Sequence, residues 1–324
     1  MRLSIGLPSF SSPSHAIPPD RFRRYVREAD ARNFAGAYLI EHLEESPTYA
    51  SSLLDPLTTL SYTAGETETL PVGTSVLLLP LRDPVLFAKR AATLQHLASR
   101  QLTLGLGTGY VESEFEAVDV PMAERGARYR EALELVRRLF TEDRVTYEGE
   151  FYSVEDFRLE PRLGQPPRLL AGGDGAGTGD DRAVPDGVLA RMGDADGWVA
   201  PPRNTDMIAS DLADIEAYLD AEGRDQSDFD RVALQYVHLV PGADDERAER
   251  EQRAVYGYFT AEGRPVQQRM DRCLTGSVDS VRETIAEYRQ LGFDELIVHP
   301  MTTEPGELDR QLRLVDELLH ADNP

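Results

Sequence analysis

Short apolar runs alternate with longer segments of helical periodicity along the whole chain. Eight runs have the length and composition of strands, and they fall at residues 3–7, 36–40, 72–79, 102–106, 168–171, 197–200, 232–239 and 295–299. Several are almost entirely apolar, which is typical of parallel strands buried on both faces. The alternation itself indicates repeated strand–helix units around a parallel sheet.

The segments between these runs predict helices, at residues 19–33, 53–64, 124–140, 205–222 and 308–320. Two further helices are predicted from their start signals. Asp83 precedes Pro84 as an N-cap, and Ser277 caps a helix that ends near Gly292. Residues 244–272 are polar and helical in pattern. Eight strands with intervening helices favour an α/β fold, a closed (β/α)8 TIM barrel, with residues 1–324 forming one domain.

Two segments interrupt this regular order. Residues 144–160 contain two β-prone runs around Glu148 and Gly149, which predicts an inserted hairpin. Residues 172–187 are rich in glycine and aspartate, and we expect a long loop there. Residues 10–18, 111–121 and 243–270 are expected to cover the barrel mouth, and they carry no pattern that identifies a substrate.

Barrel enzymes place their chemistry at the carboxyl ends of the strands. His42 and His299 fall at such ends. Residues 105–109 (GLGTG) follow the fourth strand, where the backbone could approach a flat ring or form only a tight turn. The Gly172–Gly175 cluster follows the fifth strand and offers consecutive N–H groups to a phosphate, with Arg182 expected to offset the nearby Asp174, Asp180 and Asp181.

The charge of the chain limits its partners. Asp and Glu number 57 against 34 Lys and Arg, giving a net charge of −23, and Lys89 is the single lysine. Dispersed acids of this kind indicate a halophilic protein, because high salt screens their mutual repulsion; an ordinary acidic surface is the alternative. Either interpretation argues against nucleic acid and anionic membranes as partners.

Other features exclude whole classes of site. Cys273 is the only cysteine, so we expect a reducing, cytoplasmic environment, and neither a signal peptide nor a membrane span is predicted. The six histidines show no metal-binding spacing, so no metal site is expected. Lys89 lies on the polar side of its helix, which argues against Schiff-base chemistry.

The ordered motifs resemble the luciferase-like family of flavin- and F420-dependent oxidoreductases. The resemblance rests on residues 72–140, on TYEGEFY, on LLAGGD, on DADGWVAPP and on residues 275–300, so it covers nearly the whole chain. Members of this family often have a non-proline cis peptide in the third strand that backs the flavin ring, and the matching bond here is Ser75–Val76.

The resemblance implies the following site. His42, Glu41 and Tyr110 match catalytic positions, although a glutamate replaces Tyr110 in the sugar-phosphate dehydrogenases of the family. That difference argues against glucose-6-phosphate as substrate. The positions that match cofactor contacts are Thr74, Ser75, Val76, Gly107, Thr108, Gly109, Gly172, Gly173 and Asp174. Substrate would lie on the open face of the ring, near His42, Tyr110 and His299.

Three functions follow as expectations from the resemblance. The first is hydride transfer between F420 and a small organic substrate. The second is an FMN-dependent monooxygenase supplied by a separate flavin reductase. The third is a flavin-binding barrel without catalysis. Relatives of this type also imply a homo-oligomer, a dimer.

Overall fold

The structure is a computed structural model that describes residues 1–8, 17–32, 34–45, 53–177, 181–260 and 263–320. Within these residues eight parallel strands close into a barrel, which confirms the predicted fold class. Their order around the ring is β1 (Arg2–Gly6), β2 (Ala37–Leu39), β3 (Val72–Leu78), β4 (Thr103–Gly107), β7 (Arg168–Gly172), β8 (Gly197–Ala200), β9 (Asp230–Val237) and β11 (Glu295–Pro300). Pairing of β11 with β1 and of β8 with β9 completes the ring.

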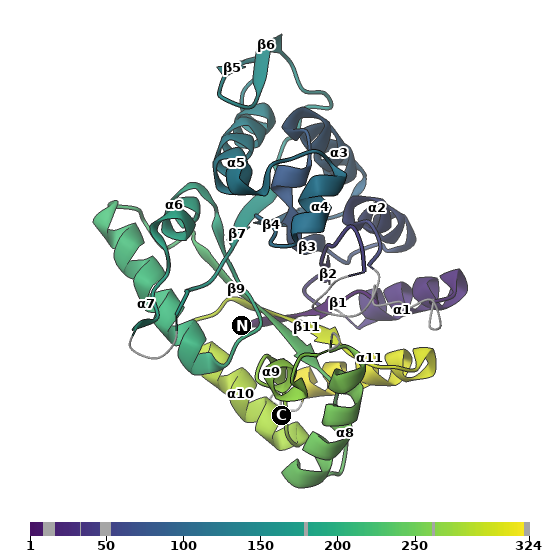
Figure 1. The fold of residues 1–324 in the computed structure, drawn as a ribbon. Helices are drawn as coiled ribbons and strands as arrows, with labels where there is room; N and C mark the ends of the chain where they lie inside the picture. The colour runs from purple at the N-terminus through teal and green to yellow at the C-terminus, as the bar shows by residue number, and fades with distance from the viewer. Residues whose placement is uncertain (9–16, 33, 46–52, 178–180, 261–262, 321–324) are drawn as a thin grey trace.

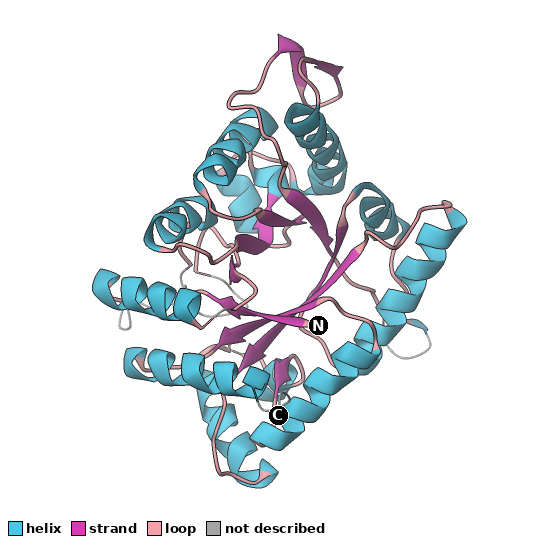
Figure 2. Ribbon diagram, turned by 180° about the vertical axis from the view of Figure 1, so that it is seen from behind, coloured by secondary structure: helices cyan, strands magenta, loops and turns pink. Residues whose placement is uncertain are grey.

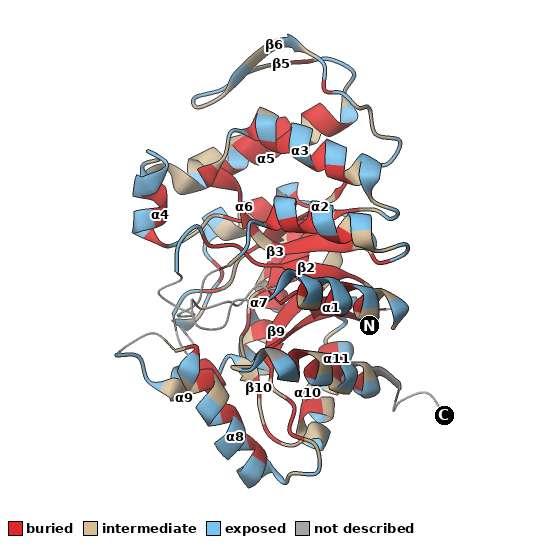
Figure 3. Ribbon diagram, turned by 90° about the vertical axis from the view of Figure 1, so that its right-hand side faces the viewer, coloured by how far each residue is buried: buried red, intermediate tan, exposed pale blue. Residues whose placement is uncertain are grey.

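Helices surround this barrel on its outside (Figures 1 and 2). They are α1 (Pro19–Ala31), α2 (Pro56–Glu66), α3 (Pro84–Leu97), α5 (Arg125–Thr141), α6 (Asp186–Asp194), α7 (Thr205–Ala221), α10 (Val278–Gln290) and α11 (Pro305–His320). Their inner faces are buried and their outer faces exposed, whereas the strands are buried throughout most of their length (Figure 3). No helix among the described residues has the length and apolar content needed to cross a bilayer.

Local sequence signals explain where several helices begin. The Asp83 carboxylate accepts a hydrogen bond from the backbone N–H of Leu86 at 2.8 Å, and Pro84 occupies the first turn, as predicted. The Ser277 hydroxyl accepts from the N–H of Ser280 at 3.2 Å, again as predicted. These caps satisfy donors that have no partner within the helix.

The hairpin is present as β5 (Val145–Glu148) and β6 (Ser153–Phe157), which pair antiparallel and project from the barrel beside α5 (Figure 1). Glu131 of α5 fixes its turn, because its carboxylate accepts hydrogen bonds from the N–H groups of Glu150, Phe151 and Tyr152.

Some predicted elements were wrong or incomplete. The expected loop at 172–187 ends in the unpredicted helix α6, which begins at Asp186 after Pro185, and an isolated bridge pairs Ala176 with Ala183. The polar segment 244–272 is divided into α8 (Asp245–Tyr258) and α9 (Val266–Met270). A short helix α4 (Glu112–Ala117) and strand β10 (Cys273–Leu274) were also missed. All five elements are short or contain glycine, so their periodicity is weak.

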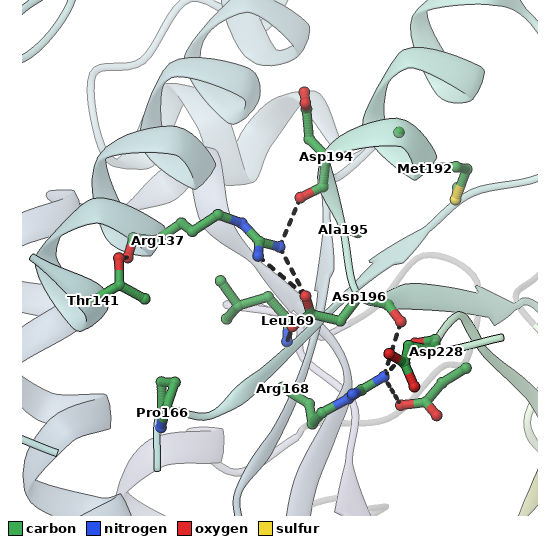
Figure 4. A network of polar contacts seen from close by, with 12 residues as sticks. Arg137, Thr141, Pro166, Arg168, Leu169, Met192, Asp194, Ala195, Asp196 and Asp228 are labelled. Carbon is green, nitrogen blue, oxygen red and sulfur yellow. Dashed lines mark hydrogen bonds and ion pairs between the residues drawn. The ribbon is translucent and has the colours of Figure 1, made fainter. Parts of the chain in front are cut away.

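A polar network joins the amino ends of β7 and β8, away from the barrel mouth (Figure 4). Asp196 precedes β8, and its carboxylate accepts from Arg137 of α5 at 3.1 Å and from the N–H of Leu169 at 2.8 Å. Arg168 donates to the carbonyl oxygens of Asp196 and Asp228 at 3.0 Å each. The network ties α5 to the starts of two strands and so stabilises this end of the barrel.

Candidate active site

The carboxyl ends of the strands surround a cavity of about 590 Å³. Its lining comes from the ends of β2, β3, β4, β7, β8 and β9 and from the segments that follow them. Except for Thr74, the residues that match catalytic and cofactor positions of the family all line it, namely Glu41, His42, Ser75, Val76, Gly107, Thr108, Gly109, Tyr110, Gly172, Gly173 and Asp174. Thr74 is buried in the barrel wall, where its hydroxyl donates to the carbonyl oxygen of Gly105 at 2.8 Å.

The third strand forms one wall of the cavity. The Ser75–Val76 bond is cis, as expected, and the pairing of β3 with β4 shifts register between Ser75 and Leu77. Val76 lies between two glycines: a Cβ on Gly107 would approach a Val76 methyl to 2.5 Å, and one on Gly172 would approach to 2.7 Å. Larger residues at either position would therefore displace Val76 from the wall.

Three side chains form a hydrogen-bonded set around His42. The His42 Nδ1 lies 3.1 Å from Oε1 of Glu114, which also accepts from the N–H of Leu43 at 2.6 Å. Because a carboxylate only accepts, Nδ1 carries the proton. The Tyr110 hydroxyl lies 3.4 Å from Nε2, and the two rings meet edge to face with centroids 5.6 Å apart.

Glu114 holds this arrangement as an ionised group. Burial alone would raise its pKa, but the hydrogen bond and charge of His42 and the N–H groups of Leu43 and Glu44 outweigh burial and lower it below the ordinary value. The Glu114 side chain is fully buried and that of His42 is 6% exposed. The carboxylate therefore orients the imidazole and leaves Nε2 toward the cavity.

Glu41, which matches a catalytic position of the family, pairs with an arginine in the structure. Its carboxylate forms an ion pair with Arg82 and accepts a hydrogen bond from the N–H of Leu78 at 2.7 Å. Burial raises the pKa of Glu41, and the Arg82 guanidinium offsets part of this effect. Glu41 thus joins β2 to the end of β3, and the carboxylate bonded to His42 is Glu114, on the unpredicted helix α4.

A buried arginine lies at the β4–β7 side of the cavity. Arg191 of α6 donates to the Thr108 hydroxyl at 3.3 Å and to the carbonyl oxygen of Gly187 at 3.0 Å, and it stacks over the ring of Tyr129. Burial lowers its pKa from the ordinary arginine value. Among the described residues no carboxylate lies within ion-pair distance of Arg191, although its side chain is buried. Such a cation suits an anionic group of a ligand.

One donor of the glycine cluster predicted to bind phosphate is already used. The N–H of Gly175 donates to the Asp211 carboxylate at 3.1 Å. Asp174 is paired chiefly with Arg203 at 2.5 Å, and Arg182 pairs with Asp211 at 2.6 Å while remaining 3.9 Å from Asp174. The expectation that Arg182 offsets Asp174 is therefore only partly met, and Asp180 lies outside the described residues. The guanidinium of Arg191, which was not predicted, lies beside Gly173.

His299 is also placed differently from the prediction. It is buried on β11, it is not among the residues that line the cavity, and its ring packs against Gly6 and the edge of Tyr236. Burial lowers the pKa of His299 to about 3, and its Nε2 has no hydrogen-bond partner among the residues that the structure describes. A histidine that is buried outside the cavity lining and stays neutral does not serve as a proton donor to substrate.

Segments near the mouth complete the site. Most of residues 10–18 lie outside the described part of the chain. The segment 111–121 contains α4 and so supplies Glu114, and the segment 243–270 contains α8 and α9. Gly109, with φ of +78°, makes the turn that brings Tyr110 over His42, a conformation that favours glycine.

Comparison with known families agrees with this geometry. The family model of luciferase-like monooxygenases matches residues 1–295. The chain belongs to this luciferase-like family. Its members include oxidoreductases and monooxygenases, so the chain is a luciferase-like oxidoreductase by family, and neither its cofactor nor its substrate follows from that membership.

Individual relatives give narrower similarities. The chain is 34% identical to the Mycobacterium tuberculosis protein Rv0940c over 149 residues, which are 46% of this chain and 48% of that protein, so the match spans about half the length of this relative. It is 30% identical over 229 residues to an F420-dependent glucose-6-phosphate dehydrogenase of Kineococcus radiotolerans, covering 68% of this chain and 65% of the relative.

A solved structure with the same fold is the monooxygenase RslO1 from Streptomyces bottropensis. Its TM-score to this chain is 0.82 at 23% identity, and the superposition covers all of both chains. At this identity the likeness concerns the fold alone. The luciferase-like barrel is therefore shared by an F420-dependent relative and a monooxygenase.

Proposed function

We propose that this protein transfers a hydride between coenzyme F420 and a small organic substrate. The observation that carries the proposal is one cavity with two chemically distinct parts. On one side His42 is held for proton exchange by Glu114 and Tyr110. On another side Arg191 is buried without a carboxylate partner among the described residues. Hydride transfer would use the first part for the accompanying proton, and the phosphate of the cofactor would use the second.

The residues present fit such a cofactor. The Ser75 hydroxyl is buried, lines the cavity and has no hydrogen-bond partner within the described part of the chain, so it could bond a ring heteroatom. Val76 gives the ring an apolar support between Gly107 and Gly172. Arg191 and Thr108 would hold the phosphate, with the guanidinium supplying charge and the hydroxyl a further hydrogen bond. When bound, F420 supplies the site with a hydride donor or acceptor.

The chain's own contribution is the proton. Moving a hydride to or from a carbon that bears oxygen requires a proton to be exchanged at that oxygen. His42 offers Nε2 to the cavity, because Nδ1 is bonded to Glu114. The Glu114 carboxylate stabilises the protonated ring, and the Tyr110 hydroxyl positions the substrate oxygen beside Nε2.

The His42 set supports hydride transfer over oxygen chemistry, since it supplies the acid–base pair that such a transfer needs. The similarity to an F420-dependent relative supports the same choice. An FMN-dependent monooxygenase would instead require a flavin reductase as partner, and a non-catalytic barrel would require no ordered proton donor.

Turnover tests this proposal. Purified protein in high salt is incubated with F420 and a panel of secondary alcohols, or with reduced F420 and the matching ketones, and the cofactor absorbance is followed without oxygen. We expect at least one pair to react, and we expect His42→Ala to lose this activity while His96→Asn, on exposed helix α3, keeps it. Oxygen-dependent turnover with reduced FMN only, or no turnover with either cofactor, would reject the proposal.

A further inference from the structure

The cavity has a charge opposite to that of the chain. The protein carries 57 acidic and 34 basic residues. Yet the described residues that line the cavity include five arginines, Arg125, Arg191, Arg203, Arg264 and Arg272, against the carboxylates of Glu41 and Asp174. Both carboxylates are already paired, Glu41 with Arg82 and Asp174 with Arg203. The cavity is therefore positive in a strongly negative protein, which concentrates anions there.

Apart from Arg203, which pairs with Asp174, these arginines form two groups on different sides of the barrel. Arg125 and Arg191 lie on α5 and α6, beside the ends of β4 and β7. Arg264 and Arg272 flank α9, in the segment that follows β9. In the ring order of the strands β9 is four positions from β3, so it lies across the barrel from the Ser75–Val76 wall. Helices α4 and α9 lie at the same end of the molecule, the mouth of the barrel (Figure 3).

The α9 segment is built as a cationic surface. Residues 264–272 read RPVQQRMDR and contain three arginines and one acid. The acid, Asp271, accepts a hydrogen bond from Gln267 at 2.9 Å. Arg269 is buried and donates to the carbonyl oxygen of Phe259 at 3.1 Å, so it fixes the segment. Arg264 and Arg272 are exposed and line both the cavity and a small recess beside it.

We propose that Arg264 and Arg272 bind an anionic group of the substrate, a carboxylate or a phosphate. The inference rests on the proposed function: a ring supported by Val76 presents its open face toward the β9 side, where these arginines lie. Guanidinium groups suit both anions, because their paired N–H groups match two oxygens. The same chemistry could also serve an acidic side chain of the cofactor, and the test separates these two sources.

The probe is inorganic phosphate, titrated by calorimetry into protein saturated with F420, so that the Arg191 site is already filled. The parent is compared with the double variant Arg264→Gln/Arg272→Gln. The control is Arg90→Gln/Arg313→Gln, which removes the same charge from exposed positions on α3 and α11. We expect phosphate to bind the parent and the control alike, and the cavity variant at least tenfold more weakly. F420 affinity should stay within threefold in all three proteins.

Two results would overturn the inference. Equal phosphate binding by the cavity variant and the control would show that these arginines do not form an anion site. A tenfold loss of F420 affinity in the cavity variant would assign them to the cofactor instead of the substrate. If F420 fails to bind the parent, the proposed function fails separately. The phosphate comparison is then repeated in the cofactor-free Arg191→Gln background, where equal binding would still reject the anion site and a tenfold loss would support it.

Discussion

Replacing Glu114 with glutamine removes the charge that holds His42 while keeping the length of the side chain. In the parent, one oxygen accepts from both Nδ1 of His42 at 3.1 Å and the N–H of Leu43 at 2.6 Å. The glutamine oxygen can accept the same two bonds, so the geometry should be retained. What is lost is the attraction between a buried carboxylate and the protonated imidazole.

The size of this loss follows from the kinds of hydrogen bond involved. A bond to a charged group contributes about 1.5–3 kcal/mol and a neutral one about 0.5–1.5 kcal/mol, so the protonated ring loses about 1–1.5 kcal/mol. If the ring carries the proton during the proposed transfer, turnover should fall roughly tenfold. The loss applies in either direction of hydride transfer.

Imidazole NMR detects this pairing directly and needs no substrate. The Nδ1–H signal of His42 is compared at one pH in the parent, in Glu114→Gln and in Glu112→Gln. Glu112 is the control, because it is an exposed acid on the same helix two residues away. We expect the signal to be displaced in Glu114→Gln alone, because only there does the acceptor of Nδ1–H change from a charged to a neutral oxygen. Equal displacement in both variants, or none, would refute the specific pairing of Glu114 with His42.

Three further predictions follow from the site, the core and the surface. His42→Ala should lower turnover while F420 affinity stays within about tenfold, or about 1.4 kcal/mol, in a fluorescence titration, and unchanged turnover would make His42 purely structural. Burial lowers the pKa of His299 to about 3, so the unfolded chain binds a proton near pH 6.5 that the folded chain rejects, and stability falls by up to about 1.4 kcal/mol per unit as pH drops through this window. His299→Phe should flatten this dependence in urea unfolding between pH 6 and 4, and a slope as steep as that of His96→Asn would contradict it. With a net charge of −23, the circular dichroism signal of the helices should decline as KCl falls below roughly 1 M, where the screening length exceeds about 3 Å, and full stability in dilute buffer would argue against halophilic adaptation.

The regular part of the barrel could be predicted because its signals are local. Strands buried on both faces produce apolar runs, and Asp83 and Ser277 mark helix starts by their own hydrogen bonds. The side of the cavity that follows β2, β3 and β4 was predicted for a similar reason. The carboxyl end of each strand is a defined position, so His42 and Thr108 could be placed there from strand order, whereas Ser75, within β3, was placed by the family resemblance.

The partners of these residues could not be predicted in the same way. Glu114 and His42 are separated by 72 positions, and nothing in either local sequence indicates that a six-residue helix brings them together. Arg191 lies on a helix whose glycines weaken its periodic pattern, so the phosphate was assigned to Gly172–Gly175 instead. One signal could have indicated Arg191. In an acidic chain, an arginine on the helix that follows a strand with a glycine-rich end is a candidate donor of hydrogen bonds to an anion.

Phosphate binding near the end of β7 is tested more cleanly at Arg191 than at Gly173. A Cβ at Gly173 would approach a Val188 methyl to 2.7 Å, so valine there would disturb α6 whether or not phosphate binds nearby. Arg191→Gln is the sharper change, because it removes the charge and leaves the glycine turn intact. Arg130→Gln, at an exposed position on α5, removes the same charge elsewhere.

Equilibrium titration of the parent, Arg191→Gln and Arg130→Gln with F420 and with FMN tests the proposed cofactor site. We expect the parent to bind F420 more tightly than FMN. We also expect Arg191→Gln to weaken F420 binding roughly 10- to 150-fold, the loss of one charged hydrogen bond, while Arg130→Gln binds as the parent does. Tighter binding of FMN, no binding of either cofactor, or equal F420 affinity in Arg191→Gln and the parent would contradict it.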